Sequence, residues 1–402
     1  MIPKIEIDRY LVAFAVLTSI LSFSSNTSIS GICGTLMLLF WAGAIGLMFF
    51  QKKIEFNNTM KYMIFTYVFF FFFFKLMYHL GFYPSGGSGQ AKFLIYCMMF
   101  YIVGYNYPWK KENALNTILT FRFIGYFILM LTTFTMLNEI EDSVLWSKNQ
   151  LGQMLGSAVI FDVFILPRVV KSKYMKFAMY ACSIPTLIAL MDIHSRTPVI
   201  ALTVVTIVNF VLKKNKTNND YWLAFGVLVL VGFLIYCLGG IEFLKELFEI
   251  DSDTNLNSAE GLNDMTSGRV NLYAIALKDF ASSPVIGVGA YAYIDNFIIC
   301  ALRTGGIVLV VFILPFVYGK LFISFRNSNI YLNSKLKDHN VYLVMYILRC
   351  FSLFFFVVSL MEGYPPLGPG TSVFMLWFFM GMAESIMTEP KAFSKEIVDP
   401  FK

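Results

Sequence analysis

The sequence predicts an all-α integral membrane protein that crosses the bilayer about twelve times, with one long loop on the outer face. Composition is the first observation behind this prediction. Hydrophobic residues make up 57% of the chain and charged residues only 14%, against roughly 25% charged in soluble domains. The second observation is the recurrence of apolar runs long enough to span a bilayer. The third is the concentration of Lys and Arg in alternate loops.

A helix needs about 20 mostly apolar residues to cross a bilayer, and we expect twelve such spans. They lie near residues 10–27, 29–50, 61–82, 90–106, 114–137, 151–167, 174–192, 197–213, 221–240, 297–319, 341–361 and 370–387. Segments 90–106 and 151–167 are short, so a tilted or partly re-entrant helix is the alternative for each. We expect the whole chain, 1–402, to form a single integral membrane domain.

Basic residues predict the orientation of these spans, because cytoplasmic loops carry an excess of Lys and Arg. One set of loops holds Lys52, Lys53, Lys110, Lys111, Arg168, Lys171, Lys173, Lys213, Lys214, Lys216, Lys320, Arg326, Lys335 and Lys337. The alternate set is nearly free of them, which predicts that both termini are cytoplasmic. The net charge of +6 is therefore a topology signal, and we expect no nucleic-acid partner.

The loop 241–296, between the ninth and tenth spans, is much longer than the others. Val270, Tyr273, Leu277 and Phe280 recur in it at helical spacing, which predicts a short amphipathic segment along the membrane surface. Long loops without a fold of their own are usually functional or disordered. This loop is therefore expected on the periplasmic or extracellular side.

The sequence contains no pattern typical of a metal or nucleotide site. All six cysteines fall inside apolar runs without a CxxC pair, so we expect neither disulfides nor a structural metal. Gly287 and Gly289 lie on the outer face without a surrounding strand–helix unit. We therefore expect no cofactor.

Arginines and a carboxylate gather on the predicted outer face. Arg196 lies at the junction of the seventh and eighth spans beside His194, and Arg269 and Asp295-Asn296 lie in the long loop. A guanidinium group suits a phosphate or diphosphate because it stays charged and binds two oxygens at once. A nearby carboxylate can accept a proton from a sugar hydroxyl. The alternative is that Arg196 only anchors a helix end at the lipid headgroups.

Several of these runs resemble bacterial O-antigen polymerases and ligases. They are Ser195-Arg196-Thr-Pro-Val-Ile-Ala-Leu; Gly268-Arg269; Ser283-Pro-Val-Ile-Gly-Val-Gly289; Ile294-Asp295-Asn296; Leu302-Arg-Thr-Gly305-Gly-Ile-Val-Leu; and Lys148-Asn149-Gln150-Leu-Gly152. The resemblance covers residues 148–320, together with the layout of spans around one large outer loop. It implies a glycosyltransferase that uses undecaprenyl-diphosphate-linked saccharides at the outer face of the bacterial cytoplasmic (inner) membrane.

Two activities share this architecture, and the resemblance implies roles for six residues. A polymerase moves a growing glycan onto the next lipid-linked repeat unit, whereas a ligase moves the finished chain onto lipid A–core. Ligases carry a His before the Asn where this sequence has Asp295, which favours a polymerase. Arg196 and Arg269 would then hold the diphosphate and Asp295 would orient or deprotonate the acceptor hydroxyl. The residues expected to bind substrate are His194, Asn296 and Arg303.

Other functions stay open at this point. A flippase of lipid-linked oligosaccharide also has about a dozen spans, but short loops and repeats are expected of it. A peptidoglycan polymerase and a membrane protein without catalysis are further alternatives. A chain-length regulator and a flippase are the membrane partners implied by the resemblance. The product would be O-antigen, capsule or exopolysaccharide.

Overall fold

The structure is a computed structural model, and the part described here is entirely helix and connecting segments, without a strand. It comprises residues 4–22, 27–51, 54–85, 93–107, 148–170, 172–192, 196–213, 221, 269–289, 294–334, 339–363, 365–368 and 373–388. The all-α prediction is confirmed for these residues. The predicted span 114–137, and all of 221–240 except Tyr221, lie outside them.

Most described helices match a predicted span to within a few residues. They are α1 (Lys4–Leu21), α2 (Thr27–Phe50), α3 (Asn58–His79), α4 (Phe93–Asn106), α6 (Lys148–Val159), the π-helix η2 (Ile160–Ile165), α7 (Leu166–Val169), α8 (Lys173–Asp192), α9 (Arg196–Leu212), α13 (Arg269–Ser282), α14 (Phe297–Asn333), α15 (His339–Met361) and α16 (Val373–Thr388). The short predicted span 151–167 is thus one continuous run of α6, η2 and α7.

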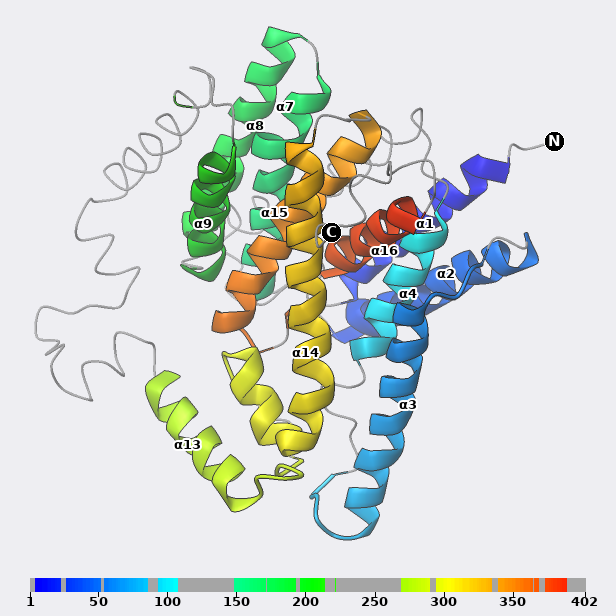
Figure 1. Cartoon of the computed structure of the whole chain (residues 1–402), viewed down its shortest axis with the longest axis vertical. Helices are drawn as coiled ribbons and strands as arrows, with labels where there is room; N and C mark the ends of the chain where they lie inside the picture. Colours follow the sequence, from blue (N-terminus) through cyan, green and yellow to red (C-terminus); the bar gives the residue numbers. More distant parts are fainter. Residues whose placement is uncertain are drawn as a thin grey trace, which may run out of the picture.

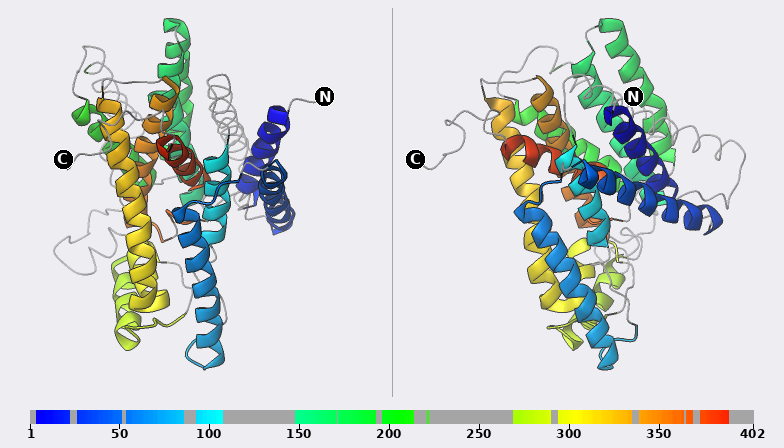
Figure 2. Two further views of the ribbon diagram at one scale, coloured as in Figure 1. Left: turned by 45° about the vertical axis from the view of Figure 1, so that its right-hand side comes forward. Right: turned by 90° about the vertical axis from the view of Figure 1, so that its right-hand side faces the viewer.

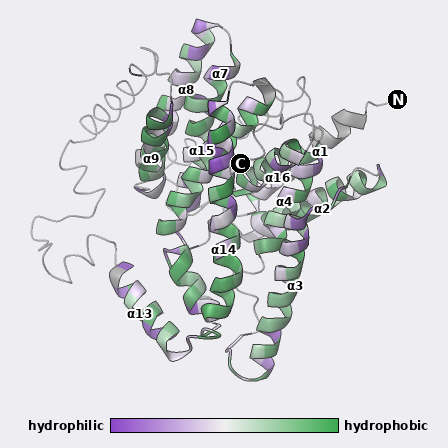
Figure 3. Ribbon diagram, viewed as in Figure 1, coloured by the Kyte–Doolittle hydropathy of each residue, from purple (hydrophilic) through white to green (hydrophobic). Residues whose placement is uncertain are grey.

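Five of the described helices are long and apolar enough to cross a membrane. Their outer surfaces are apolar as well: Phe50 is 84% exposed and Phe72 65% exposed. Figure 3 shows hydrophobic residues along most of α14 and α15, whereas α13 mixes hydrophobic and hydrophilic residues. Exposed apolar surface on this scale requires an apolar surrounding medium. The count of twelve spans and the orientation of the termini stay predictions.

The helices pack in groups around α14 and α15 (Figure 1). α15 packs on α14, α9 and α16, α16 crosses α4, and α6 packs on α8 and α9. α1 and α2 pack on each other at one edge of the molecule, as the left view of Figure 2 shows. Gly104 and Gly381 permit the α4–α16 crossing, because a Cβ on Gly104 would lie 2.0 Å from the carbonyl oxygen of Phe378.

α14 is sharply bent, and this corrects the predicted tenth span. Gly306 has non-helical angles, with φ of 60° and ψ of −157°, and divides the element in two. The Phe297 and Tyr318 rings lie only 6.2 Å apart, whereas 21 residues of straight helix would separate them by about 30 Å. The first part therefore folds back beside the second (Figure 1). Lys320 and Arg326, expected in a loop, lie inside the second part.

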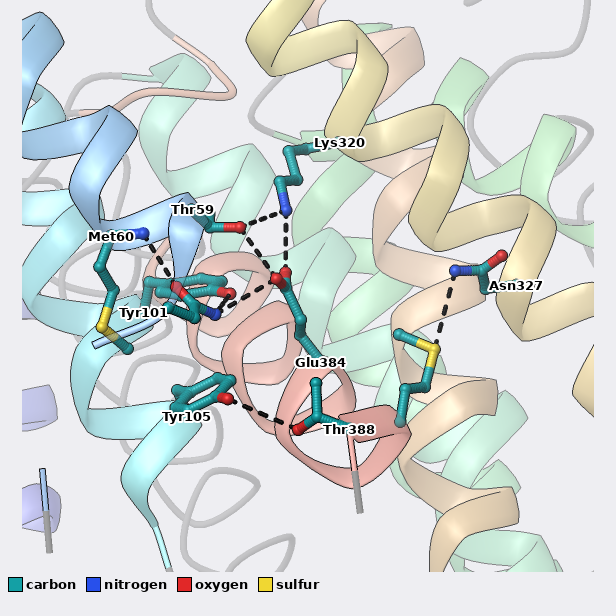
Figure 4. A network of polar contacts seen from close by, with 10 residues as sticks. Thr59, Met60, Tyr101, Tyr105, Lys320, Asn327, Glu384 and Thr388 are labelled. Carbon is teal, nitrogen blue, oxygen red and sulfur yellow. Dashed lines mark hydrogen bonds and ion pairs between the residues drawn. The ribbon is translucent and has the colours of Figure 1, made fainter. Parts of the chain in front are cut away.

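A polar network links α14 to α3, α4 and α16 (Figure 4). Lys320 Nζ donates to Glu384 Oε2 at 2.9 Å, and Thr59 Oγ1 donates to Glu384 Oε1 at 2.9 Å. Asn57 donates to both Glu384 and the hydroxyl of Tyr101. These bonds satisfy charges that would otherwise be costly inside an apolar bundle.

Candidate active site

Two of the predicted site residues form an ion pair where α13 begins. Arg269 is the first residue of α13, and Asp295 lies just before α14. Arg269 Nε lies 2.8 Å from Asp295 Oδ2, and the two side chains are 23% and 16% exposed. The sequence placed these residues 26 positions apart, and the fold brings them into direct contact.

A second ion pair, of opposite polarity, joins the other ends of the same two helical segments. Arg303 Nη2 lies 2.7 Å from Asp279 Oδ2. Between the two pairs, Tyr273 and Ala276 of α13 pack against Ile294 and Cys300. α13 and the first part of α14 therefore lie side by side in the same direction. The structure places Arg303 with Asp279, about 15 Å along α13 from Arg269.

The inward face of α13 differs in part from the predicted apolar stripe. Tyr273 and Phe280 are partly buried, as expected, but Leu277 is 47% exposed and Ala276 is buried instead. The helix is thus confirmed, whereas the face toward the protein is set by its ion pairs. The outward face still carries Leu272 and Ile275, which are 42% and 52% exposed.

Asp295 has one carboxylate oxygen bound and one without a partner among the described residues. Oδ2 accepts from Arg269, and the backbone carbonyl accepts a hydrogen bond from the hydroxyl of Tyr273. Oδ1 is buried and has no hydrogen-bond partner among the described residues. A buried carboxylate oxygen without a donor is costly and unusual. Oδ1 is therefore the acceptor in this cluster that a substrate hydroxyl can satisfy.

Arg269 is stabilised as a cation by two carboxylates. Burial lowers its pKa, but the negative charges of Asp295 and Glu362 outweigh that effect, so the net pKa of Arg269 is raised. The guanidinium group therefore stays charged over the whole physiological pH range. Burial raises the pKa of Tyr273, with Arg269 opposing the shift and the two carboxylates adding to it. Tyr273 thus remains a neutral hydrogen-bond donor.

Glu362, which the sequence reasoning missed, lies in this neighbourhood. It follows α15 directly and is 1% exposed. Thr197 Oγ1 donates to its Oε1 at 3.2 Å, and Asn149 Nδ2 donates to its Oε2 at 3.1 Å. Thr197 adjoins Arg196 at the start of α9, so Glu362 links the Arg196 junction to the surroundings of Arg269. Its signal in the sequence was an isolated acid in the last predicted outer loop.

Asn296 holds the ends of two helices together. Its Oδ1 accepts from the backbone N–H groups of Ile298 and Ile299, which caps α14. Its Nδ2 donates to the carbonyl of Leu360 at 2.9 Å. These bonds attach the segment carrying Asp295 to the end of α15. Substrate binding by Asn296 stays a prediction.

The backbone of the segment 283–289 stabilises the bend in α14 through hydrogen bonds. Val288 N donates to Arg303 O at 2.9 Å, and Ile307 N donates to Pro284 O at 2.9 Å. These bonds satisfy backbone groups freed where the helix breaks. A Cβ on Gly306 would lie 2.5 Å from the carbonyl oxygen of Val285. The run is thus structural, and the Tyr83 hydroxyl donates to Ile286 O beside it.

The described part of the chain offers no group of His, Cys, Asp and Glu able to hold a metal ion. Four described cysteines, at positions 33, 97, 300 and 350, form no disulfide with one another. His194, expected to bind substrate, lies outside the described residues. Arg196 is the first residue of α9 and is partly buried.

The fold and the cluster define a helical membrane protein with charged residues gathered where α9, α13 and α15 begin or end. A family model described as O-Antigen ligase matches residues 181–302. This match supports placing the chain in the O-antigen polymerase/ligase superfamily, in agreement with the resemblance of its motifs. The match includes Arg196, Arg269, Asp295 and Asn296. No curated protein matches the chain.

Proposed function

We propose that this protein is a polysaccharide polymerase at the outer face of the bacterial cytoplasmic (inner) membrane. It transfers a growing glycan from undecaprenyl diphosphate to a hydroxyl of the next lipid-linked repeat unit. The observation that carries this proposal is the partly buried pair of Arg269 and Asp295, which leaves one buried carboxylate oxygen without a partner among the described residues. The match to the ligase family model supports the broader class of glycosyltransferase.

The proposed reaction needs a group that accepts a proton and groups that stabilise the leaving diphosphate. Asp295 can supply the first, and Arg269 and Arg196 the second. The acceptor oxygen attacks the anomeric carbon of the donor, and its proton passes to Asp295 Oδ1. The bond between that carbon and the diphosphate oxygen breaks, and its electron pair leaves with undecaprenyl diphosphate. Arg269 and Arg196 stabilise the charge that develops on the leaving group. A diphosphate is a good leaving group, so the proposed reaction requires no nucleotide.

The proposal favours polymerase over ligase because of residue 295. Ligases resembling this chain have a His there, whereas this chain has an Asp already paired with Arg269. A ligase is the second candidate function, and two observations favour it. The matching family model is described by that activity, and His194 adjoins the Arg196 junction in sequence. Glycan would then pass to lipid A–core.

The proposed substrate implies partners in the same membrane. A flippase must deliver each lipid-linked oligosaccharide to the outer face before polymerisation. A chain-length regulator would limit the product, which is O-antigen, capsular polysaccharide or exopolysaccharide. Arg303 and Asn296 would shape the site through the contacts described above, and His194 would contact substrate.

Deletion of the gene separates the candidates. Without a polymerase, surface glycan collapses from a ladder to a single repeat unit. Without a ligase, full chains stay on undecaprenyl diphosphate and lipid A–core remains bare. Without a flippase, no glycan is exported. Either of the last two patterns would refute the polymerase proposal.

Single substitutions test the residues. Arg196→Ala, Arg269→Ala and Asp295→Ala should each fail to restore the ladder to the deletion strain at normal protein level. Lys278→Ala is the matched control, because Lys278 is an exposed cation on the same helix as Arg269. Restoration of full-length polysaccharide by all three variants would contradict the proposed function.

A further inference from the structure

Glu362 is the most deeply buried carboxylate among the charged groups near Arg269. A buried carboxylate is costly unless hydrogen bonds and a cation compensate it. Thr197 and Asn149 supply one hydrogen bond to each oxygen. Arg269 supplies positive charge, since the charge of Glu362 contributes to its raised pKa. Side chains from α6 and α9 therefore meet at Glu362, and its charge acts on Arg269 at the start of α13.

The backbone around Glu362 is clamped to the segment that carries Asp295. Asn296 Nδ2 donates to Leu360 O on one side of Glu362. On the other side, a Cβ at Gly363 would lie 2.0 Å from the carbonyl oxygen of Ile294. Further on, the Trp377 indole donates to Pro366 O at 2.8 Å. The backbone on each side of Glu362 is thus held in place, by the segment that carries Asp295 and by α16.

We infer that Glu362 is a positioning residue that holds the Arg196 end of α9 and the Arg269 end of α13 in one diphosphate-binding site. The inference rests on the proposed function and adds a residue that lies outside the matched segment 181–302. The carboxylate of Glu362 does not act as the base. Both of its oxygens already accept bonds from the protein, whereas Asp295 Oδ1 has no such partner among the described residues.

A carboxylate is needed at this position for two reasons. Its two oxygens each accept from a donor on a different helix, whereas an amide keeps one oxygen and replaces the other with an N–H donor. Its charge also adds to that of Asp295 in stabilising the Arg269 cation. In Glu362→Gln, either the Thr197 hydroxyl or the Asn149 amide loses its carboxylate oxygen and must turn to pair with an amide N–H group. The first turn of α9 then loses its fixed position relative to Arg269.

Purified protein and lipid-linked repeat units extracted from the deletion strain provide the assay. Glu362→Gln should lower kcat/KM roughly 10- to 100-fold, the scale of a misplacement near 1 Å, with a raised KM for the lipid-linked donor. Glu362→Asp should recover part of the loss. Thr197→Val and Asn149→Ala should each lower kcat/KM severalfold. Glu384→Gln is the matched control, because it neutralises a carboxylate in the separate Lys320 network.

The outcomes distinguish the inference from the proposed function. If Glu362→Gln keeps kcat/KM within twofold of the parent protein while Arg269→Ala is inactive, the inference is wrong and the function stands. If Arg196→Ala, Arg269→Ala and Asp295→Ala all stay active, the function itself is wrong. Should Glu362→Gln fail to fold, unchanged kinetics in both Thr197→Val and Asn149→Ala would equally overturn the inference.

Discussion

Replacement of Gly363 by alanine tests how closely the end of α15 must approach the segment that carries Asp295. A Cβ at this position would lie 2.0 Å from the carbonyl oxygen of Ile294 and 3.1 Å from its carbonyl carbon. Real Cβ contacts essentially never fall below 3.0 Å. The backbones at Gly363 and Ile294 must therefore separate by at least 1.0 Å, because the atoms that the Cβ would meet belong to the backbone and not to a flexible side chain.

The displacement falls directly on the proposed catalytic carboxylate. Ile294 precedes Asp295, and the Asn296 bond to Leu360 resists the separation. Overpacking costs about 1–3 kcal/mol of stability, which a membrane protein with many other helix contacts can tolerate. A misplacement of about 1 Å can cost about 100-fold in rate. We therefore expect Gly363→Ala to lose activity far more than it loses folded protein.

The assay compares kcat/KM per folded molecule with the amount of protein recovered from membranes. Gly46→Ala is the control, because a Cβ there meets nothing within 4 Å, and it should behave as the parent protein. Gly363→Ala at parental kcat/KM would refute the reasoning, since the close approach would then have no bearing on the site. A loss of protein without a loss of specific activity would do the same.

Three further perturbations test other parts of the molecule. Gly306→Ala places a side chain at φ of 60° and against a backbone carbonyl, so we expect this variant to have reduced thermal stability in detergent. Gly319→Ala is the control and should keep its stability, because a Cβ at Gly319 meets nothing within 4 Å. Glu384→Gln leaves Lys320 without its carboxylate partner, and the melting temperature should fall while kcat/KM per folded molecule stays constant. Exchanging Asp279 and Arg303 preserves their ion pair. If the exchange recovers the activity that Arg303→Ala loses, Arg303 serves to hold the two helices together. If activity is not recovered, Arg303 contacts the substrate.

Local sequence patterns predicted the helices well. Most described helices begin and end within a few residues of the predicted spans, because continuous apolar runs bounded by polar residues dominate this composition. The first span was predicted at 10–27, whereas α1 begins and ends six residues earlier. The helix over the amphipathic segment was also predicted, from apolar residues at helical spacing. The tenth span was wrong in its bounds, since the break at Gly306 depends on hydrogen bonds to Pro284 and Val285 that hydropathy does not encode.

The candidate site was predicted in part. Arg269 and Asp295 were named from residue type and motif, and the fold joins them. Their contact depends on α13 lying beside the first part of α14, which spacing alone did not indicate. Glu362 was missed because it lies far along the chain from the other motif residues. Its partners, Thr197 and Asn149, are brought to it only by the packing of α15 on α9 and of α9 on α6.

A site that binds a diphosphate and also holds a carboxylate faces an electrostatic conflict. In the proposed reaction the carboxylate of Asp295 would compete with the diphosphate for Arg269, because like charges repel strongly where water is scarce. The proposed proton transfer resolves this conflict. When Asp295 takes the proton of the acceptor hydroxyl it becomes neutral, and its hold on Arg269 weakens. The guanidinium group then interacts more strongly with the leaving diphosphate as charge develops there.

Asp295→Asn separates these two effects. The amide keeps the size of the side chain but removes the negative charge that competes for Arg269, so affinity for the lipid-linked donor should rise or stay constant. The amide cannot accept the proton, so kcat should fall by about 100-fold or more, the scale of general-base catalysis. Binding of the lipid-linked donor to purified protein and single-turnover rates measure the two effects separately. If Asp295→Asn keeps the parental kcat, Asp295 is not the base. If this variant also binds the lipid-linked donor more weakly, Asp295 serves only to hold Arg269 in place.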